Sequence, residues 1–210
     1  MYVPKQFAVQ EPGVLFDLIE AHSFGILVAG GGDDLAATHL PFLVERNRGG
    51  NATLLCHMAR ANPHWRALDN RPALAIFVGP HAYVSPIWYE EPRAAVPTWN
   101  YAAVHAHGTA RLVTDAARLG DIVTRLAGVH EAGRSPEWSP TMISSALLGG
   151  MLKAIVGVEI AVERLKGVHK LSQNRSAIDR RQVIAALRGS GEPSDRALAD
   201  YMHKHACPPE

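Results

Sequence analysis

The sequence lacks the features that mark several large protein classes. It has 210 residues but only two cysteines, Cys56 and Cys207, so a disulfide framework is excluded and a reduced, cytoplasmic protein is the simplest interpretation. No apolar run approaches the ~20 residues that span a bilayer. Residues 1–10 lack the apolar centre of a secretion signal, so we expect neither a leader nor a membrane partner. The formal net charge is only +1, which gives no indication of nucleic-acid binding.

What the sequence does contain is a series of short apolar segments separated by turn residues. Strands are predicted at 23–29, 36–44, 52–57, 73–78, 81–85, 100–113 and 155–164. Helices are predicted at 14–22, 65–68, 116–130, 141–151, 177–187 and 195–203. Residues 30–34 join two strands and lack a dinucleotide-binding pattern, so they predict a turn. About six strands with tight connections and helices at the edges favour a small antiparallel barrel.

The first polar cluster follows the strand at 52–57. Here Arg60 precedes an Asn62-Pro63 pair, which is typical of a capped helix start. Unpaired backbone N–H groups at such a start attract phosphate, and an arginine adds a bidentate cation. On this stretch alone, a capped helix with a solvated arginine is the simpler explanation of the same residues.

The second polar cluster lies at residues 169–175, at the boundary between an apolar run and a helix. Lys170 and Ser172 can hold a phosphate group, and Gln173 and Asn174 can donate and accept hydrogen bonds at once, as a polar ring edge requires. The alternative is that Ser172 or Asn174 only caps the helix at 177–187.

Aromatic and histidine side chains give weaker signals. Four aromatic residues lie in irregular, proline-rich segments and can line a pocket or plug the end of a barrel: Trp88, Tyr89, Trp99 and Tyr101. His105 and His107 share one face of a strand, but no third ligand follows with convincing spacing, so no metal site is predicted. A nucleophile motif for hydrolytic chemistry is also absent.

Taken in order, these segments resemble the PaiB family of FMN-binding negative transcriptional regulators, within the flavin-binding split-barrel superfamily. The resemblance covers about the first 190 positions and includes six stretches: Met1–Pro4, Ala37–Pro41, His57–Trp65, Gly79–Pro86, Val96–Tyr101 and Lys170–Asn174.

The resemblance implies a mainly β fold with peripheral helices: a six-stranded antiparallel split β-barrel at 1–174, and a C-terminal helical extension at 175–210. It also implies a homodimer with FMN at the subunit interface. Arg60 and the helix start after Asn62 would hold the phosphate, with Lys170 and Ser172 helping. The remaining implied contacts to the flavin are Thr38, His39, His57, Trp99, Asn100 and Gln173.

Two functions follow from the resemblance. The first is an FMN-binding regulator. Direct DNA binding is possible through Arg180, Arg181 and Arg188, although a solvated helix face explains these arginines more simply. The alternative is a flavin-dependent oxidoreductase, similar to pyridoxamine-phosphate oxidases or flavin reductases, in which the flavin carries the redox chemistry. No acid–base pair in the sequence indicates a substrate, and no catalytic residue is nominated.

Overall fold

The computed structural model describes residues 1–31, 35–47 and 51–206. Cys207 and part of the predicted turn at 30–34 therefore lie outside the described residues. The strands are β1 (Ala8–Val9), β2 (Phe24–Ala29), β3 (Ala36–Pro41), β4 (Leu43–Arg46), β5 (Ala52–Ala59), β6 (Arg71–Val84), β7 (Thr98–Val113) and β8 (Ile155–Lys170). The helices are α1 (Pro12–Ala21), α2 (Ala116–Glu131), α3 (Ser145–Lys153), α4 (Ala177–Gly189) and α5 (Pro193–Ala206).

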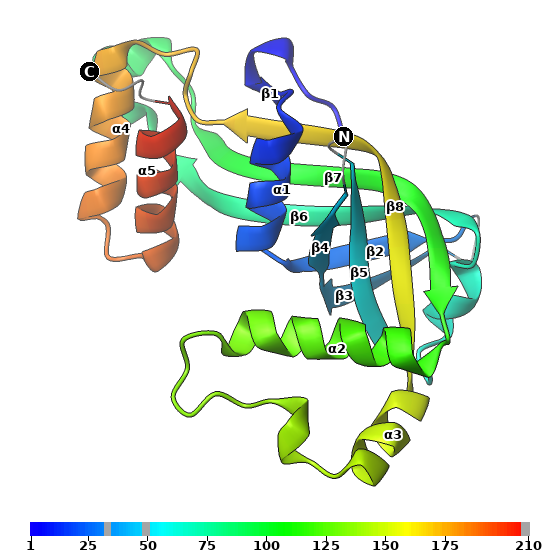
Figure 1. The fold of residues 1–210 in the computed structure, drawn as a ribbon. Coiled ribbons are helices and arrows are strands. Elements are labelled where there is room, and N and C mark those ends of the chain that lie inside the picture. The colour runs from blue at the N-terminus through cyan, green and yellow to red at the C-terminus, as the bar shows by residue number, and fades with distance from the viewer. Residues whose placement is uncertain (32–34, 48–50, 207–210) are drawn as a thin grey trace. The chain divides into compact units, whose positions relative to one another are not determined.

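All eight of these strands belong to one sheet, with the order β3-β2-β6-β7-β8-β5-β4 and with β1 paired to β8 (Figure 1). The pairs β2–β3, β2–β6, β4–β5 and β5–β8 are antiparallel. The mainly β, antiparallel fold predicted from the sequence is confirmed, with two strands more than the six expected. The difference lies in β1, which has two residues, and in β4, which was predicted as the end of β3.

The break between β3 and β4 falls at Phe42. Its N–H bonds to the carbonyl oxygen of Ser23 at 2.8 Å rather than to a strand partner. Its side chain is buried and meets the ring of Phe77 edge-on, with the ring centroids 5.1 Å apart. Burying this ring turns the chain and divides one predicted strand into two.

Two other predictions of strand bounds were wrong. Gly79-Pro80 was expected to break a strand, yet β6 continues through it. A Cβ at Gly79 would lie 2.8 Å from the Leu18 side chain and 3.3 Å from that of Ala102, so the glycine admits close neighbours within an unbroken strand. The last strand was expected to end at residue 164, but β8 runs on to Lys170.

The chain forms two compact units, and β6, β7 and β8 contribute residues to both. Unit 1 contains Met1–Leu18, Val78–Val104 and Lys166–Glu210, and unit 2 contains Ile19–Phe77 and His105–Leu165. In unit 1, α4 and α5 lie side by side (Figure 1) and share a core with Ala82, Val84 and Leu171. In unit 2, α2 packs on Leu55 of β5 and Val113 of β7. The predicted domain boundary at residue 174 stays a prediction.

Candidate functional site

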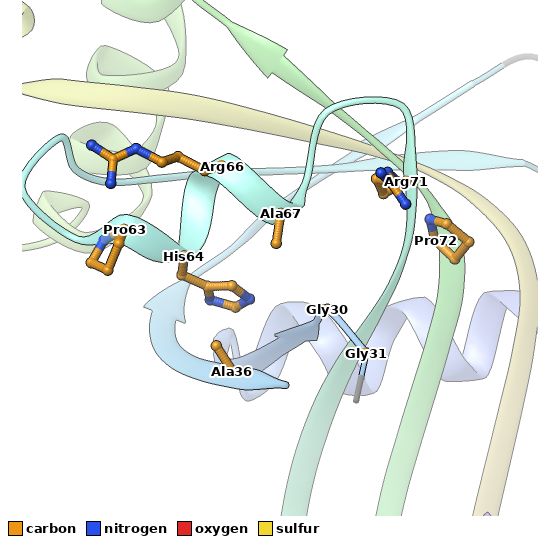
Figure 2. Close-up of a pocket in the computed structure, with 9 residues that line it drawn as sticks. All are labelled: Gly30, Gly31, Ala36, Pro63, His64, Arg66, Ala67, Arg71 and Pro72. Atoms are coloured by element: carbon orange, nitrogen blue, oxygen red, sulfur yellow. The ribbon is translucent and has the colours of Figure 1, made fainter. Parts of the chain in front are cut away.

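The larger polar pocket lies in unit 2, beside the 3-10 helix Pro63–Ala67. The side chain of Asn62 accepts a hydrogen bond from the His64 N–H at 3.0 Å, and Pro63 occupies the first helical position, as the sequence predicts. The pocket has a volume of about 690 Å³ and is lined by residues from this helix, the end of β2 and the starts of β3 and β6 (Figure 2). We call it the His64 pocket.

A chain of hydrogen bonds fixes the His64 ring at the wall of this pocket. Because the Asn62 oxygen accepts from the His64 N–H, its amide nitrogen is free to donate to the Thr38 hydroxyl at 3.1 Å. The same hydroxyl lies 2.8 Å from His64 Nδ1. While its oxygen accepts from Asn62, the Thr38 hydroxyl can donate its own proton to Nδ1, and in that arrangement the ring proton lies on Nε2. Burial lowers the pKa of His64, so the ring is neutral.

His64 Nε2 is the unusual atom of the pocket. The side chain is 4% exposed, and Nε2 is buried with no hydrogen-bond partner among the described residues. An unpaired buried donor is costly, by about 1–3 kcal/mol, so such atoms are rare unless a ligand or water meets them. In Figure 2 the imidazole lies between the 3-10 helix and the segments that carry Ala36 and Gly30. The donor therefore favours a ligand with an acceptor oxygen.

Two arginines line the His64 pocket without a counter-charge. In Figure 2 Arg71 lies beside Pro72, and the Arg66 side chain extends away from the His64 ring; neither forms an ion pair with any residue that the structure describes. Arg66 is held over the Trp65 ring, with its guanidinium carbon 5.2 Å from the ring centroid. Two cations and a neutral N–H donor around one cavity are suited to an anion, above all a phosphate group.

Two other arginines of unit 2 are neutralised by carboxylates. Arg118 bonds Glu45, Glu159 and Asp121 at 2.7–2.9 Å, and Arg125 bonds Glu45 at 2.5 Å. These bonds raise the pKa of the Arg118 guanidinium and lower the pKa of the Glu45 carboxyl. The network joins α2 to β4 and β8 and leaves no charge for a ligand.

Arg60, the residue predicted to hold phosphate, is partly used by the fold. Its Nε donates to the carbonyl oxygen of Lys153 at 2.9 Å and its Nη2 to that of Ile155 at 3.0 Å. These bonds tie the end of β5 to the junction of α3 and β8. One guanidinium nitrogen, Nη1, remains for an anion, and the role of Arg60 in binding stays a prediction.

The predicted strand residues of unit 2 fall in separate places. Thr38 and His39 are adjacent on β3, so their side chains face opposite sides of the strand. Thr38 bonds His64, whereas His39 is exposed and stacks against Phe24, with ring centroids 6.2 Å apart. His57 is half-buried on β5, burial lowers its pKa, and its Nδ1 has no hydrogen-bond partner among the described residues.

The predicted residues of unit 1 gather at the junction of β7 and β8. Asn100 is 1% exposed and its amide nitrogen donates to the Ser172 hydroxyl at 2.9 Å. Lys170 donates to the Thr98 hydroxyl, and burial lowers the pKa of its ammonium. The structure thus brings together Asn100, Lys170 and Ser172, which are up to 72 positions apart.

Gln173 and Trp99 lie differently from their neighbours. The Gln173 side chain accepts from the Leu171 N–H at 2.7 Å and donates to the His169 carbonyl, so both ends of its amide are used within its own turn. Trp99 is 54% exposed and contacts the rings of His81 and Tyr83. Contacts of Gln173 and Trp99 with a flavin stay predictions.

Sequence reasoning missed His64, Arg66 and Arg71. His64 and Arg66 lie in or next to the predicted helix start, whereas Arg71 begins β6. A buried histidine cannot be told from a solvated one by spacing alone, because its burial depends on Thr38, 26 residues earlier.

Two further features are absent from the described part of the chain. No group of three or more His, Cys, Asp or Glu side chains is arranged to hold a metal ion there. None of the described helices has the length and apolar character needed to cross a membrane.

The order and antiparallel pairing of the strands define the fold as a split barrel. Residues 1–164 match the family model described as "Putative FMN-binding domain", and the chain belongs to this family, whose cofactor is FMN or a related flavin. The resemblance predicted from the sequence is confirmed. The chain is 36% identical to protease synthase and sporulation protein PAI 2 of Bacillus subtilis over 203 residues, which cover 96% of each protein.

Solved structures support the fold at low sequence identity. The FAD and heme binding protein of Mycobacterium smegmatis superposes with a TM-score of 0.59 at 19% identity, over 87% of this chain and 80% of that one. The flavocytochrome Anf3 of Azotobacter vinelandii gives the same TM-score at 12% identity, over 80% of this chain and 72% of that one.

Proposed function

We propose that this protein is an FMN-binding regulator of the PaiB type that works as a homodimer, and that the His64 pocket receives the FMN phosphate. The observation that carries the proposal is the buried, unpartnered Nε2 of His64 in a pocket whose arginines have no counter-ion among the described residues. A volume of about 690 Å³ suits a mononucleotide, since small-molecule sites commonly enclose roughly 300–1,000 Å³.

Within this pocket each group has a distinct role toward the cofactor. His64 donates a hydrogen bond from a neutral ring, and Thr38 and Asn62 hold that ring in its tautomer. Arg66 and Arg71 supply the charge that offsets a phosphate dianion. When bound, FMN would supply redox chemistry or a redox-dependent signal. The contacts implied by the family resemblance for Arg60, His57 and His39 belong to the same proposal.

The regulatory role rests on the family and on the relative from Bacillus subtilis, whose name refers to protease synthesis and sporulation. Within unit 1, Arg188 pairs with Asp200 at 3.0 Å and Arg180 donates to the Arg175 carbonyl at 2.7 Å. With two of the three arginines on α4 engaged in this way, indirect regulation is favoured over a DNA-binding helix. A promoter fragment that this protein retards, with binding that weakens steeply as salt rises, would contradict the indirect route.

The phosphate assignment is tested by titrating flavin-free protein with FMN and with riboflavin, which lacks the phosphate, while flavin fluorescence is measured. Replacing His64 by Phe or Arg71 by Met removes a bond to a charged group, worth roughly 1.5–3 kcal/mol. We expect FMN affinity to fall about ten- to hundredfold and riboflavin affinity to change little. Arg111→Met removes an exposed arginine from the same unit and should leave both affinities unchanged.

Equal losses for FMN and riboflavin would reject the phosphate assignment while leaving flavin binding intact. Sedimentation of the wild-type protein with and without FMN tests the homodimer. A monomer under both conditions would contradict it.

A further inference from the structure

A second, smaller pocket lies in unit 1 and is not needed for the phosphate assignment above. It has a volume of about 190 Å³ and is formed around the start of β7 and the turn after β8. Its walls include Phe7, Tyr89, Thr98, Asn100, Lys170 and Arg175. We call it the Lys170 pocket. Its volume is too small for a whole flavin nucleotide, because sites for such ligands enclose roughly 300 Å³ or more.

One wall of the Lys170 pocket presents a buried acceptor. Asn100 is 1% exposed, and its amide nitrogen donates to the Ser172 hydroxyl at 2.9 Å and contacts the Met202 sulfur at 3.5 Å. Its Oδ1 is buried with no hydrogen-bond partner among the described residues. An unsatisfied buried carbonyl oxygen calls for a ligand that carries an O–H or N–H donor.

The same pocket contains two cations without counter-ions. Neither Lys170 nor Arg175 forms an ion pair within the described part of the chain. Lys170 uses one of its three donors on Thr98, and burial lowers its pKa, so its charge is poorly solvated. Arg175 is held with its guanidinium carbon 4.4 Å from the centroid of the Tyr89 ring. An anionic group placed between them would neutralise both.

Two of the remaining lining residues are aromatic, beside a mixed set that includes Gln6, Val96 and Asn174. Phe7 and Tyr89 are 7% and 5% exposed, and their rings border the pocket beside the polar groups. Buried rings favour a flat, apolar ligand body through edge or stacking contacts. A ligand with charge alone, such as free phosphate, would leave this side of the pocket unused.

From these three walls we infer that the Lys170 pocket binds a small aromatic carboxylate that bears a hydroxyl group. The carboxylate meets Lys170 and Arg175, the ring lies against Phe7 and Tyr89, and the hydroxyl donates to Asn100 Oδ1. This inference does not depend on the FMN proposal. It gives Lys170, Ser172 and Asn100 a ligand other than the FMN that the family resemblance implies for them.

The probe for this inference is 4-hydroxybenzoate, titrated calorimetrically into flavin-free protein. We expect saturable binding with one molecule per chain. Benzoate, which lacks the donor, should bind about tenfold more weakly, the effect of one hydrogen bond. 4-Hydroxybenzyl alcohol, which lacks the charge, should not bind at millimolar concentrations. Lys170→Met should weaken 4-hydroxybenzoate at least tenfold, whereas Arg181→Met removes an exposed arginine of α4 and should have no effect.

Three results would overturn the inference: no binding of 4-hydroxybenzoate to the wild type, equal binding to wild type and Lys170→Met, or competition by FMN and by inorganic phosphate for the same site. The last result would assign the pocket to the flavin phosphate instead. His64→Phe separates the two proposals, because it should weaken FMN and leave 4-hydroxybenzoate binding unchanged. If His64→Phe leaves FMN affinity unchanged while 4-hydroxybenzoate binds as expected, the assignment of FMN phosphate to the His64 pocket is rejected. The inference for the Lys170 pocket then stands.

Discussion

The two pockets hold their buried polar atoms in different ways. In unit 2, His64 is the second residue of a capped 3-10 helix, and the capping side chain of Asn62 also orients its partner Thr38. In unit 1, Asn100 is the third residue of a long strand, and its partner Ser172 comes from a turn 72 positions later. The first site combines a local helix cap with one tertiary contact to Thr38, whereas the second depends only on a tertiary contact between two strand ends. The first should therefore tolerate changes elsewhere in the chain better than the second.

Acid should affect unit 1 most strongly, through His169. Burial and the nearby charge of His205 lower its pKa to about 4 from an ordinary value of 6.5, so it is neutral in the folded protein and hydrogen-bonded to Tyr201 at 2.9 Å. The unfolded chain takes up the proton first, so its stabilising contribution is present above pH 6.5 and is lost as pH falls toward 4. We expect a loss of about 2 kcal/mol between pH 7 and pH 5.

Urea unfolding at the two pH values measures this loss. His169→Gln should make the free energy of unfolding depend less on pH, whereas His203→Gln, an exposed residue of α5, should keep the wild-type dependence. If the free energy of unfolding of His169→Gln changes between the two pH values as much as that of the wild type, the assignment to His169 is contradicted.

Removing the Ser172 hydroxyl, the partner of Asn100 in unit 1, should give the next largest loss of stability. Ser172→Ala leaves the Asn100 amide nitrogen with only the Met202 sulfur, and we expect a loss of about 1.5 kcal/mol in the free energy of unfolding. The measurement is again urea unfolding, with Ser194→Ala as an exposed control. If the free energy of unfolding falls equally in Ser172→Ala and Ser194→Ala, the buried hydrogen bond does not contribute to stability.

Removing the partner in unit 2 should cost less stability but more binding. Thr38→Val deprives His64 Nδ1 and the Asn62 amide of their shared hydroxyl at a half-buried position, and we expect a loss of about 1 kcal/mol. Because the ring tautomer is no longer fixed, FMN affinity should fall while riboflavin affinity changes less. Intact discrimination between the two flavins in Thr38→Val would show that the hydroxyl does not set the tautomer.

The smallest expected effect concerns the neutralised arginines of unit 2. Arg118 and Arg125 are about one-third exposed in their side chains, so the solvent screens their ion pairs. Arg125→Met should lower the free energy of unfolding by less than about 1 kcal/mol, and this difference should shrink as sodium chloride rises. A salt-independent loss would indicate lost packing of the side chain instead.

The same contrast explains which parts could be predicted from the sequence. The Asn62-Pro63 cap, the Asp115 cap of α2 and the alternation of buried positions along β7 are local signals, and all are present in the structure. The extension of β8 was missed because Glu163, Arg164 and Lys166 look like the end of a strand. Long-range hydrogen bonds such as Thr38–His64 and Asn100–Ser172 depend on the order of the strands in the sheet, which local residue spacing does not encode.

Ser172 carries a consequence for how this chain can evolve. Its φ of +64° lies in the left-handed region, where glycine is the least strained residue. Glycine would relieve this strain but would lose the hydroxyl that accepts from Asn100, so selection for thermal resistance alone should favour neither residue strongly. Under selection for a bound ligand serine would be retained, so the identity of residue 172 in the survivors would reveal which demand was applied.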